Sequence, residues 1–575
     1  MEIVRWIIFL LFLCCNRLLL ILAKAVSSSS SISGSSAPAA SSLSSSPRCI
    51  YNSIEKTLIT HCPRLKRYVQ LQISSSSNSK NKKSASSSSL KINCQSLSSS
   101  YTPPSLSKGI HGYEGLFGFL NISSHHYIVF IKASASADYI GEGVREITEL
   151  DIQPLSHSRN AFSLPLNLHM NELKQTLAKH RFFYTAPIDS SSSSPSKKSS
   201  SNWLSNKAPK AYFDVTRSYQ ENICRQLDKG RRSKYSVPLW SDADERFFWN
   251  LNLISPLVNN SLAHAFIIPI SNIWTLSKDF TIGDEQFQLT LISRRSRMRQ
   301  GPRFVKRGID EFGDVANFVE TEHILRSSKG AVASFVQIRG SIPLHWKQTE
   351  WWRLKPNIIP LYNHVRHYIS ALQKHIHDLY ACYILPAGNR HYTSLKEEEE
   401  DNGFETSRPK DVKDVYIVNL IDKHSMQGAL GRWLSASLRA LDRRNPYKLL
   451  PDGLPSYIQR DPRYSNRTIV LVDDVSCQLP SLPQTVHLRH IWFDYHKKAD
   501  AQMNSVRELF PLLFASSSRG YSDPKKTFYF YHDEKKRIKS LQNNIIRTNC
   551  IDCLDRTNVI QVRTPKLPIF YEYRL

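Results

Sequence analysis

Short apolar runs and helical spacings mark the ordered parts of the chain. Continuous apolar runs of four to eight residues are typical of buried strands, whereas apolar residues three and four positions apart are typical of helices. Strands are predicted on this basis over residues 116–120, 126–133, 287–293, 335–338 and 415–421. Helical spacing covers 361–380 and, more weakly, 501–514. Strand and helix alternate in the C-terminal half, which predicts an α/β core there.

Serine-rich tracts interrupt this pattern. Residues 27–47 are predicted to be disordered, because a serine-rich segment buries too little apolar surface to fold. Two further serine-rich tracts, 74–100 and 190–201, lie between apolar segments, and an acidic stretch covers 397–410. We interpret these three as surface insertions, since long loops add little to the free-energy cost of folding.

The amino terminus, residues 1–26, is strongly apolar but is interrupted by basic and amide side chains. Its longest uninterrupted apolar run, 6–15, is shorter than the roughly 20 residues that a membrane-spanning helix needs. We interpret the segment as an anchor or as an error in the assigned start of the chain. A secretory signal is less favoured, because it would bring the cysteine chemistry described below into an oxidising compartment.

Basic residues outnumber acidic ones by 76 to 49, which gives a formal net charge of +27. Such an excess favours a polyanionic partner: an anionic membrane surface, a phosphorylated ligand or nucleic acid. The arginines gather within 294–307 without the pattern of a zinc finger, a homeodomain or an RNA-recognition motif. No nucleic acid is therefore expected, and an anionic membrane is preferred to a cationic surface that has no partner.

The segment 547–558, RTNCIDCLDRTN, carries the most specific chemistry. Cys550 is followed, after five residues, by Arg556 and then by Thr557. This spacing suits a loop around one phosphate, with the thiolate as nucleophile and the planar guanidinium bound to two phosphate oxygens. A helix that begins near Arg556 would add its dipole and lower the thiol pKa. The remaining residues expected to bind the phosphate are Asn549, Ile551, Cys553 and Leu554.

Alternatives exist for the same residues. Cys550 and Cys553 form a Cys-x-x-Cys, as in half of a zinc site or in a redox pair. No second pair follows at zinc-finger spacing, so neither a metal nor a cofactor is predicted. Asp552 and Asp555 suit neither alternative; one of them, with Asp552 preferred, is the candidate proton donor to the leaving oxygen. Cys553 would protect Cys550 through a reversible disulfide, or it would simply pack.

The longer stretch 547–561, RTNCIDCLDRTNVIQ, resembles the signature of the Sac-domain phosphoinositide phosphatases, which include Sac1-like proteins and the amino-terminal domain of synaptojanins. Upstream segments resemble the same family in the expected order, over about 48–561 in all. These segments are 115–132, 248–250 (FWN), 293–325 (SRRSRMRQGPRFVKRGIDEFGDVANFVETEHIL), 334–343 (SFVQIRGSIP, with Trp346 after it) and 491–496 (IWFDYH).

The resemblance implies an α/β fold, α+β overall. A β-rich amino-terminal subdomain, 48–285, would pack on an α/β catalytic subdomain, 286–561, that holds the Cys-x5-Arg loop. It implies removal of a phosphate from the inositol ring of phosphatidylinositol phosphates through a cysteinyl-phosphate, with the 4-phosphate favoured over the 3-phosphate. The implied partners are phosphoinositide lipids at an anionic membrane surface. The resemblance favours the membrane of the endoplasmic reticulum or Golgi, with the catalytic subdomain facing the cytosol.

After Gln561 the chain departs from the family pattern. Residues 562–575 contain Pro565 and Pro568, which disfavour a helix, so the helix behind the loop is predicted to have about two turns. We interpret this tail as truncated. The alternative function is therefore a catalytically weak or inactive Sac-domain module that binds phosphoinositide membranes or a partner protein. A protein tyrosine phosphatase would share the loop chemistry but has no support outside it.

Overall fold

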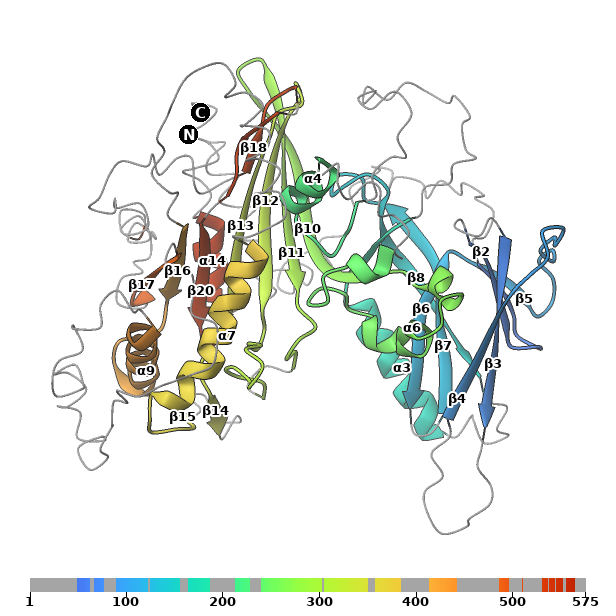
Figure 1. Ribbon diagram of the computed structural model, residues 1–575, viewed down its shortest axis with the longest axis horizontal. Helices are drawn as coiled ribbons and strands as arrows, with labels where there is room; N and C mark the ends of the chain where they lie inside the picture. Colours follow the sequence, from blue (N-terminus) through green and yellow to red (C-terminus); the bar gives the residue numbers. More distant parts are fainter. Residues whose placement is uncertain are drawn as a thin grey trace, which may run out of the picture. The chain divides into compact units, whose positions relative to one another are not determined.

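The computed structural model describes residues 49–62, 67–76, 89–122, 125–155, 164–186, 213–227, 239–301, 305–349, 357–383, 413–441, 486–495, 509, 530–535, 537–542, 544–551 and 555–563. These residues form a mixed α/β, strand-rich structure, which confirms the coarse fold class (Figure 1). They divide into two compact units. The first takes Ser36–Ser218 and Lys229–Trp274, and the second takes Tyr219–Asp228 and Thr275–Leu575. The sequence had suggested a boundary near residue 285.

The first unit is built mainly from antiparallel strands. One sheet has the order β4-β3-β2-β1-β5, and β6 to β9 pair in succession, each antiparallel to the next. The strands are β1 (Cys49–Asn52), β2 (Thr57–Cys62), β3 (Arg67–Ser76), β4 (Ser89–Ser96), β5 (Ile110–Tyr113), β6 (Gly115–Ile122), β7 (His125–Ser136), β8 (Val144–Pro154) and β9 (Phe182–Thr185). The helices are α3 (Leu164–Ala178), η1 (Leu239–Asp242), η2 (Leu251–Ile254), α6 (Ser255–Val258) and η3 (Ala263–Phe266).

The interpretation of 74–100 as one surface insertion needs correction. The first residues of this tract end β3, and Ser89–Ser96 forms β4, paired with β3. Leu90, Ile92 and Cys94 alternate with polar residues and pack against the core, as the two-residue period of a strand requires. The high serine content had hidden this alternation. Residues 1–48, 77–88, 187–212 and 384–412 lie outside the described residues, and the predictions for 1–26, 27–47, 190–201 and 397–410 lie there too.

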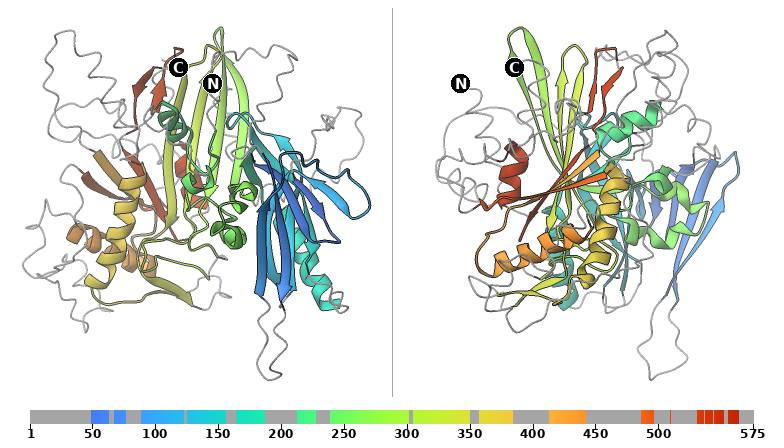
Figure 2. Two further views of the ribbon diagram at one scale, coloured as in Figure 1. Left: turned by 45° about the vertical axis from the view of Figure 1, so that its right-hand side comes forward. Right: turned by 60° about the vertical axis from the view of Figure 1, so that its left-hand side comes forward.

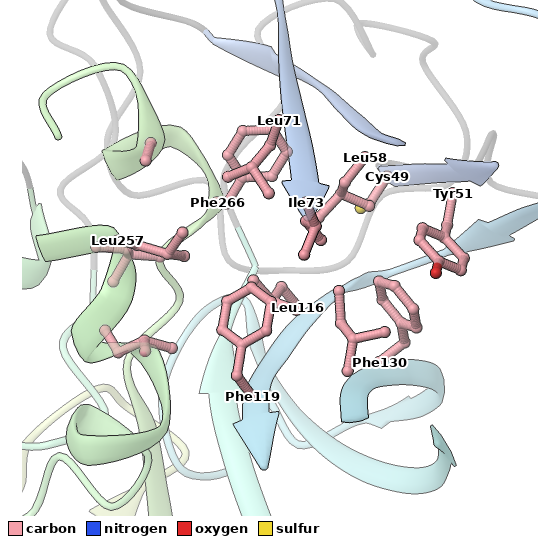
Figure 3. Close-up of a cluster of buried hydrophobic side chains, with 14 of the residues drawn as sticks. Cys49, Tyr51, Leu58, Leu71, Ile73, Leu116, Phe119, Phe130, Leu257 and Phe266 are labelled. Carbon is pink, nitrogen blue, oxygen red and sulfur yellow. The ribbon is translucent and has the colours of Figure 1, made fainter. Parts of the chain in front are cut away.

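The core of the first unit lies between its two sheets (Figure 3). Leu58 and Leu71 come from the five-stranded sheet, and they face Leu116 and Phe130 of β6 and β7. Phe266 of η3 closes the cluster at one side. These side chains are almost completely buried, and each contributes roughly 1.5–3 kcal/mol through removal of its apolar surface from water.

A buried asparagine ties the loop after η1 to this core. The side-chain amide of Asn250 donates to the carbonyl oxygens of Phe117 (2.9 Å) and Ile268 (3.1 Å). Its Oδ1 accepts the N–H of Ile270 at 3.0 Å, and the residue is fully buried. Asparagine is the residue that can donate twice and accept once here. This explains the third position of the FWN segment.

Replacement of Asn250 by aspartate is expected to destabilise the protein by about 3 kcal/mol, because a carboxylate cannot donate to two carbonyl groups and would be buried without a cation. A urea titration followed by tryptophan fluorescence measures the loss. Asn260→Asp is the matched control, since the Oδ1 of Asn260 only accepts, from the N–H of Leu262 at 3.0 Å. Equal losses in the two variants would contradict the proposed role of Asn250.

The second unit has a mixed sheet with the order β17-β16-β20-β13-β12-β11. The strands from β17 to β13 run parallel, and β12 and β11 continue antiparallel. The strands are β10 (Ile270–Ile282, which crosses the division), β11 (Glu285–Arg295), β12 (Val319–Ser327), β13 (Val332–Ser341), β14 (Trp346–Thr349), β15 (Asn357–Pro360), β16 (Lys413–Asn419), β17 (Val486–Trp492), β18 (Phe530–His532), β19 (Ile538–Ser540) and β20 (Ile545–Cys550). The helices are α4 (Tyr219–Leu227), α7 (Arg366–Tyr383), α9 (Ser425–Leu441) and α14 (Asp555–Arg563).

Helices cover both faces of the parallel strands in this unit (Figure 2). On one face, Ile560 of α14 packs in a cluster with Val418 of β16 and Ile546 of β20. On the other face, Arg547 of β20 contacts His375 of α7. Successive β20 residues thus point to opposite faces, and burial on both sides explains the continuous apolar runs of the parallel strands.

The five predicted strands correspond to β6, β7, β11, β13 and β16, and the predicted helix over 361–380 corresponds to α7. The weaker helix prediction over 501–514 falls almost wholly outside the described residues. Among the helices that the structure describes, none is long and apolar enough to cross a membrane.

Candidate functional site

The two ends of the predicted phosphate loop lie on β20 and α14. Cys550 is the last residue of β20, and its Cα is paired in register with Ser341 of the parallel strand β13. All six residues of β20 are buried, and the Cys550 side chain is 4% exposed. Parallel strands end at one edge of the sheet, so Cys550 lies at the edge where α/β proteins place their ligands.

The helix after the loop is short, as the sequence predicted. α14 begins at Asp555 and ends at Arg563, which is nine residues or about 2.5 turns. Arg556 lies in its first turn and is mostly buried, with 19% of its side chain exposed. Thr557, the next residue, is fully buried.

The Arg556 guanidinium is directed at the connection between β16 and α9. Its Nη1 donates to the Leu420 carbonyl oxygen and to Gln427 Oε1, both at 3.3 Å. Asp422 Oδ1 lies 3.5 Å from the same nitrogen. The sequence prediction missed these acceptors. They could have been found from their position at the end of the predicted strand 415–421 and just after it. Residues at the ends of neighbouring parallel strands meet at one edge of the sheet.

The segment quoted as IWFDYH holds this connection in place. The Phe493 N–H donates to the Asn419 carbonyl oxygen at 2.9 Å, and the Trp492 indole donates to the Ile421 carbonyl oxygen at 2.9 Å. Asp494 Oδ2 accepts the N–H of Lys423, also at 2.9 Å. Three successive residues of 491–496 therefore fix the backbone that carries the acceptors of the arginine in α14.

Two asparagines lie side by side at the same edge. Asn549, a predicted phosphate-binding residue, is paired in register with Asn419 of β16, and both are fully buried. Among the residues that the structure describes, neither side-chain amide has a hydrogen-bond partner, and the Thr557 hydroxyl has none either. Buried polar groups without partners cost about 1–3 kcal/mol each. These atoms are consequently suited to bind the backbone of the loop or a bound anion.

The other predicted site residues divide into two groups. Ile551 is buried directly after Cys550, and Asp555 is the first residue of α14, with its side chain outside the described atoms. Asp552, Cys553 and Leu554 lie outside the described residues. The inward direction of the loop N–H groups and the choice of proton donor therefore stay predictions.

The second unit holds another buried thiol, Cys224 of α4. Burial raises the pKa of the Cys224 thiol to about 12, and the nearby negative charge of Glu221 contributes a smaller part of this increase. Such a thiol stays protonated at neutral pH and is a poor nucleophile.

Within the described part of the chain, no group of three or more His, Cys, Asp or Glu residues is placed to hold a metal ion.

The arginine-rich block 294–307 is partly internal. Arg294 is fully buried, and its Nη1 contacts Glu320 at 2.9 Å and Glu322 at 3.1 Å. Burial opposes the charge, but the two carboxylates hold the pKa of Arg294 above its usual value. Arg307 is also buried and donates to Gln348 Oε1 at 2.6 Å. These two residues stabilise the fold.

A buried arginine links β20 to its neighbours. Arg547 Nε donates to His375 Nε2 at 2.7 Å, and its Nη2 donates to the Ser341 carbonyl oxygen at 2.8 Å. His375 Nδ1 lies 2.9 Å from the Gly313 carbonyl oxygen. The histidine must accept from the arginine and donate to the carbonyl, which fixes a neutral ring with the proton on Nδ1.

Fold and site together define a mixed α/β protein with a buried cysteine at the C-terminal edge of parallel strands and an arginine in the first turn of the next helix. The chain belongs to the SacI homology domain family, which it matches over residues 114–500. This confirms the resemblance drawn from the motifs. The match ends before Cys550, so the assignment of the loop rests on the residues of 547–561 themselves.

Relatives of the chain include named phosphatases. The chain is 27% identical to the phosphoinositide phosphatase SAC6 of Arabidopsis thaliana over 452 residues, which cover 78% of this chain and 58% of that protein. It is 28% identical over 368 residues to the phosphatidylinositol-3-phosphatase SAC1 of Saccharomyces cerevisiae, with 61% and 45% covered. It is 32% identical over 286 residues to the inositol-1,4,5-trisphosphate 5-phosphatase 1 of Schizosaccharomyces pombe, with 50% and 19% covered. The chain thus spans about half the length of the first two relatives.

Proposed function

We propose that this chain is a phosphoinositide phosphatase that uses Cys550 as its nucleophile. The observation that carries the proposal is the placement of Cys550 at the end of β20 and of Arg556 in the first turn of α14, with five residues between them in sequence. The names of the relatives, which are phosphoinositide phosphatases, support phosphoinositides as the substrate class. A cytosol-facing site at a membrane, in the endoplasmic reticulum or Golgi, is part of the same proposal.

The reaction has two steps. The thiolate of Cys550 attacks phosphorus, an S–P bond forms, and the bond between phosphorus and the inositol oxygen breaks. Asp552 or Asp555 gives a proton to that oxygen, so inositol leaves as an alcohol. Water then attacks the cysteinyl-phosphate, which releases inorganic phosphate and restores the thiolate. Arg556 and the loop N–H groups stabilise the phosphate oxygens in both transition states, and Thr557 donates to the departing sulfur.

The ring position belongs to the proposal as well. The 4-phosphate is favoured by the motif resemblance, whereas the relatives named SAC1 in yeast and zebrafish are called 3-phosphatases. A substrate panel must therefore contain both monophosphates.

The purified chain is expected to release phosphate from short-chain phosphoinositides without added metal, and Cys550→Ser is expected to lower the rate about 10³-fold or more, because it removes the nucleophile. Malachite-green detection over a panel of ring isomers measures the rate and names the preferred position. Cys94→Ser changes a half-buried cysteine of the first unit and serves as the matched control. A folded wild-type chain without turnover would instead favour the lipid- or protein-binding module.

A further inference from the structure

Several large apolar side chains of the second unit are exposed. They lie in two segments, 305–312 and 359–362, and Phe312 and Val305 are 69% and 65% exposed. The full set is Val305, Phe312, Ile359, Leu361 and Tyr362, and we call it the docking surface. Isolated exposed apolar residues are common on proteins, but a group of them marks a place of contact.

Both segments meet at the stretch that follows β13. The Ile309 N–H donates to the Leu344 carbonyl oxygen at 2.9 Å, and the Leu361 N–H donates to the His345 carbonyl oxygen at 3.0 Å. The Tyr362 ring lies 5.4 Å from the His345 ring, measured between centroids. Figure 1 shows β14, β15 and the start of α7 together at this end of the unit.

This end of the unit is also the end at which Cys550 lies. β13 ends at Ser341, the register partner of Cys550, and His345 follows only four positions after Ser341. Four residues span at most about 14 Å. In addition, the Gly308 N–H donates to Ser341 Oγ at 3.0 Å.

A second line of contacts joins Phe312 to the catalytic strand. Its neighbour Gly313 bonds through its carbonyl oxygen to His375, and His375 in turn accepts from Arg547, three residues before Cys550. Lys374 Nζ donates to the Glu311 carbonyl oxygen at 2.7 Å, which ties the same loop to α7. The docking surface is thus fixed rigidly to the edge that holds the thiol.

Cations lie in the same segments as these apolar residues. Among the described residues of 299–314, 345–349 and 357–374, five cations are exposed or partly exposed, against three acids: Arg299, Lys306, Lys347, Arg366 and Lys374 against Asp310, Glu311 and Asp314. The Asp310 carboxylate is used within its own loop, where Oδ1 accepts the N–H groups of Phe312 and Asp314 and Oδ2 lies 3.8 Å from Arg299. Apolar side chains rimmed by Lys and Arg are the composition that binds anionic bilayers, because the cations attract the head groups while the apolar groups enter the interface.

We propose that the docking surface inserts into the interface of an anionic lipid bilayer and so turns the edge that holds Cys550 toward the lipid head groups. Its consequence for catalysis rests on the proposed phosphatase function, whereas its binding to lipid does not. A bilayer is preferred to a protein partner because the surface combines exposed apolar side chains with an excess of positive charge.

Vesicle binding tests the surface without any reaction. The full chain is sedimented with phosphatidylcholine vesicles that contain phosphatidylserine and no phosphoinositide. Val305→Asp/Phe312→Asp is expected to bind about tenfold more weakly, and Ile54→Asp, an equally exposed apolar residue of the first unit, is expected to bind like wild type. Lys306→Glu/Lys347→Glu is expected to show a similar loss and a weaker dependence on salt.

Kinetics separate the docking surface from the chemistry. The Val305→Asp/Phe312→Asp variant is expected to keep its rate on a soluble short-chain phosphoinositide and to lose about tenfold on the same head group in vesicles. Retention of that soluble rate also shows that the variant is folded. Unchanged vesicle binding in both double variants, or equal losses with Ile54→Asp, would overturn the proposal. Normal vesicle binding by a wild-type chain without turnover would overturn the phosphatase function and leave the docking surface intact.

Discussion

Arg556→Lys is expected to lower phosphate release by about 10²-fold or more while the protein stays folded. In the structure, one nitrogen of the guanidinium, Nη1, contacts the Leu420 carbonyl oxygen, Gln427 and Asp422. A planar fork can keep such contacts and still bind two phosphate oxygens, whereas an ammonium group is a single point of charge. Loss of one such donor to a developing charge commonly costs 10²–10³ in rate.

The measurement is initial phosphate release from a soluble short-chain phosphoinositide, so that membrane binding does not contribute. Arg537→Lys provides the matched control, because Arg537 is an exposed arginine that pairs with Asp533 at 2.9 Å, away from α14. The control is expected to match wild type. If Arg556→Lys retained more than about a tenth of the activity, the arginine would only hold the β16–α9 connection and would not contact phosphate.

Glu322→Gln is expected to destabilise the protein by about 3–5 kcal/mol, the usual cost of breaking a buried ion pair. The Glu322 carboxylate is fully buried and accepts from Arg294 at 3.1 Å and from the Ser334 hydroxyl at 2.8 Å. Its two oxygens also accept the N–H of Tyr219, at 2.9 and 3.0 Å, and so cap α4. A neutral amide would leave Arg294 with less compensating charge and would remove one acceptor from the helix end.

Thermal and urea denaturation measure this loss. Glu149→Gln removes an even shorter ion pair, with Lys132 at 2.6 Å, but both of those side chains are about half exposed. An exposed pair contributes about 0–1 kcal/mol, so the control is expected to change stability little. Similar effects in the two variants would show that burial does not strengthen the Glu322 contacts.

Local pattern was enough to predict the strands that are buried on both faces. β16 and β7 read as continuous apolar runs, which are typical of strands buried on both faces. β4 was missed because its apolar residues, Leu90 and Ile92, alternate within a serine-rich tract that looks disordered by composition. The assignment of α4 to the second unit was also out of reach, because it depends on a contact to a residue far along the chain.

The site was predictable where one segment holds it and not where distant segments meet. Spacing alone placed Cys550 before a helix that carries Arg556. The acceptors Asp422 and Gln427 follow a different strand, and only the parallel pairing of β16 with β20 brings them close. Arg294 could not be placed from local pattern either, because an arginine in a basic run is usually exposed and only its two buried carboxylates reveal that it is internal.

The cap of α4 has a consequence for how the chain folds during synthesis. Tyr219 and Glu322 are 103 residues apart, so α4 is made long before its capping carboxylate exists. At roughly 5–20 residues per second, the interval lasts about 5–20 s. A helix of nine residues is unstable by itself in water. The segment must therefore remain without its capping carboxylate until residue 322 is made, which makes this helix a natural point for chaperones to bind and for misfolding to begin.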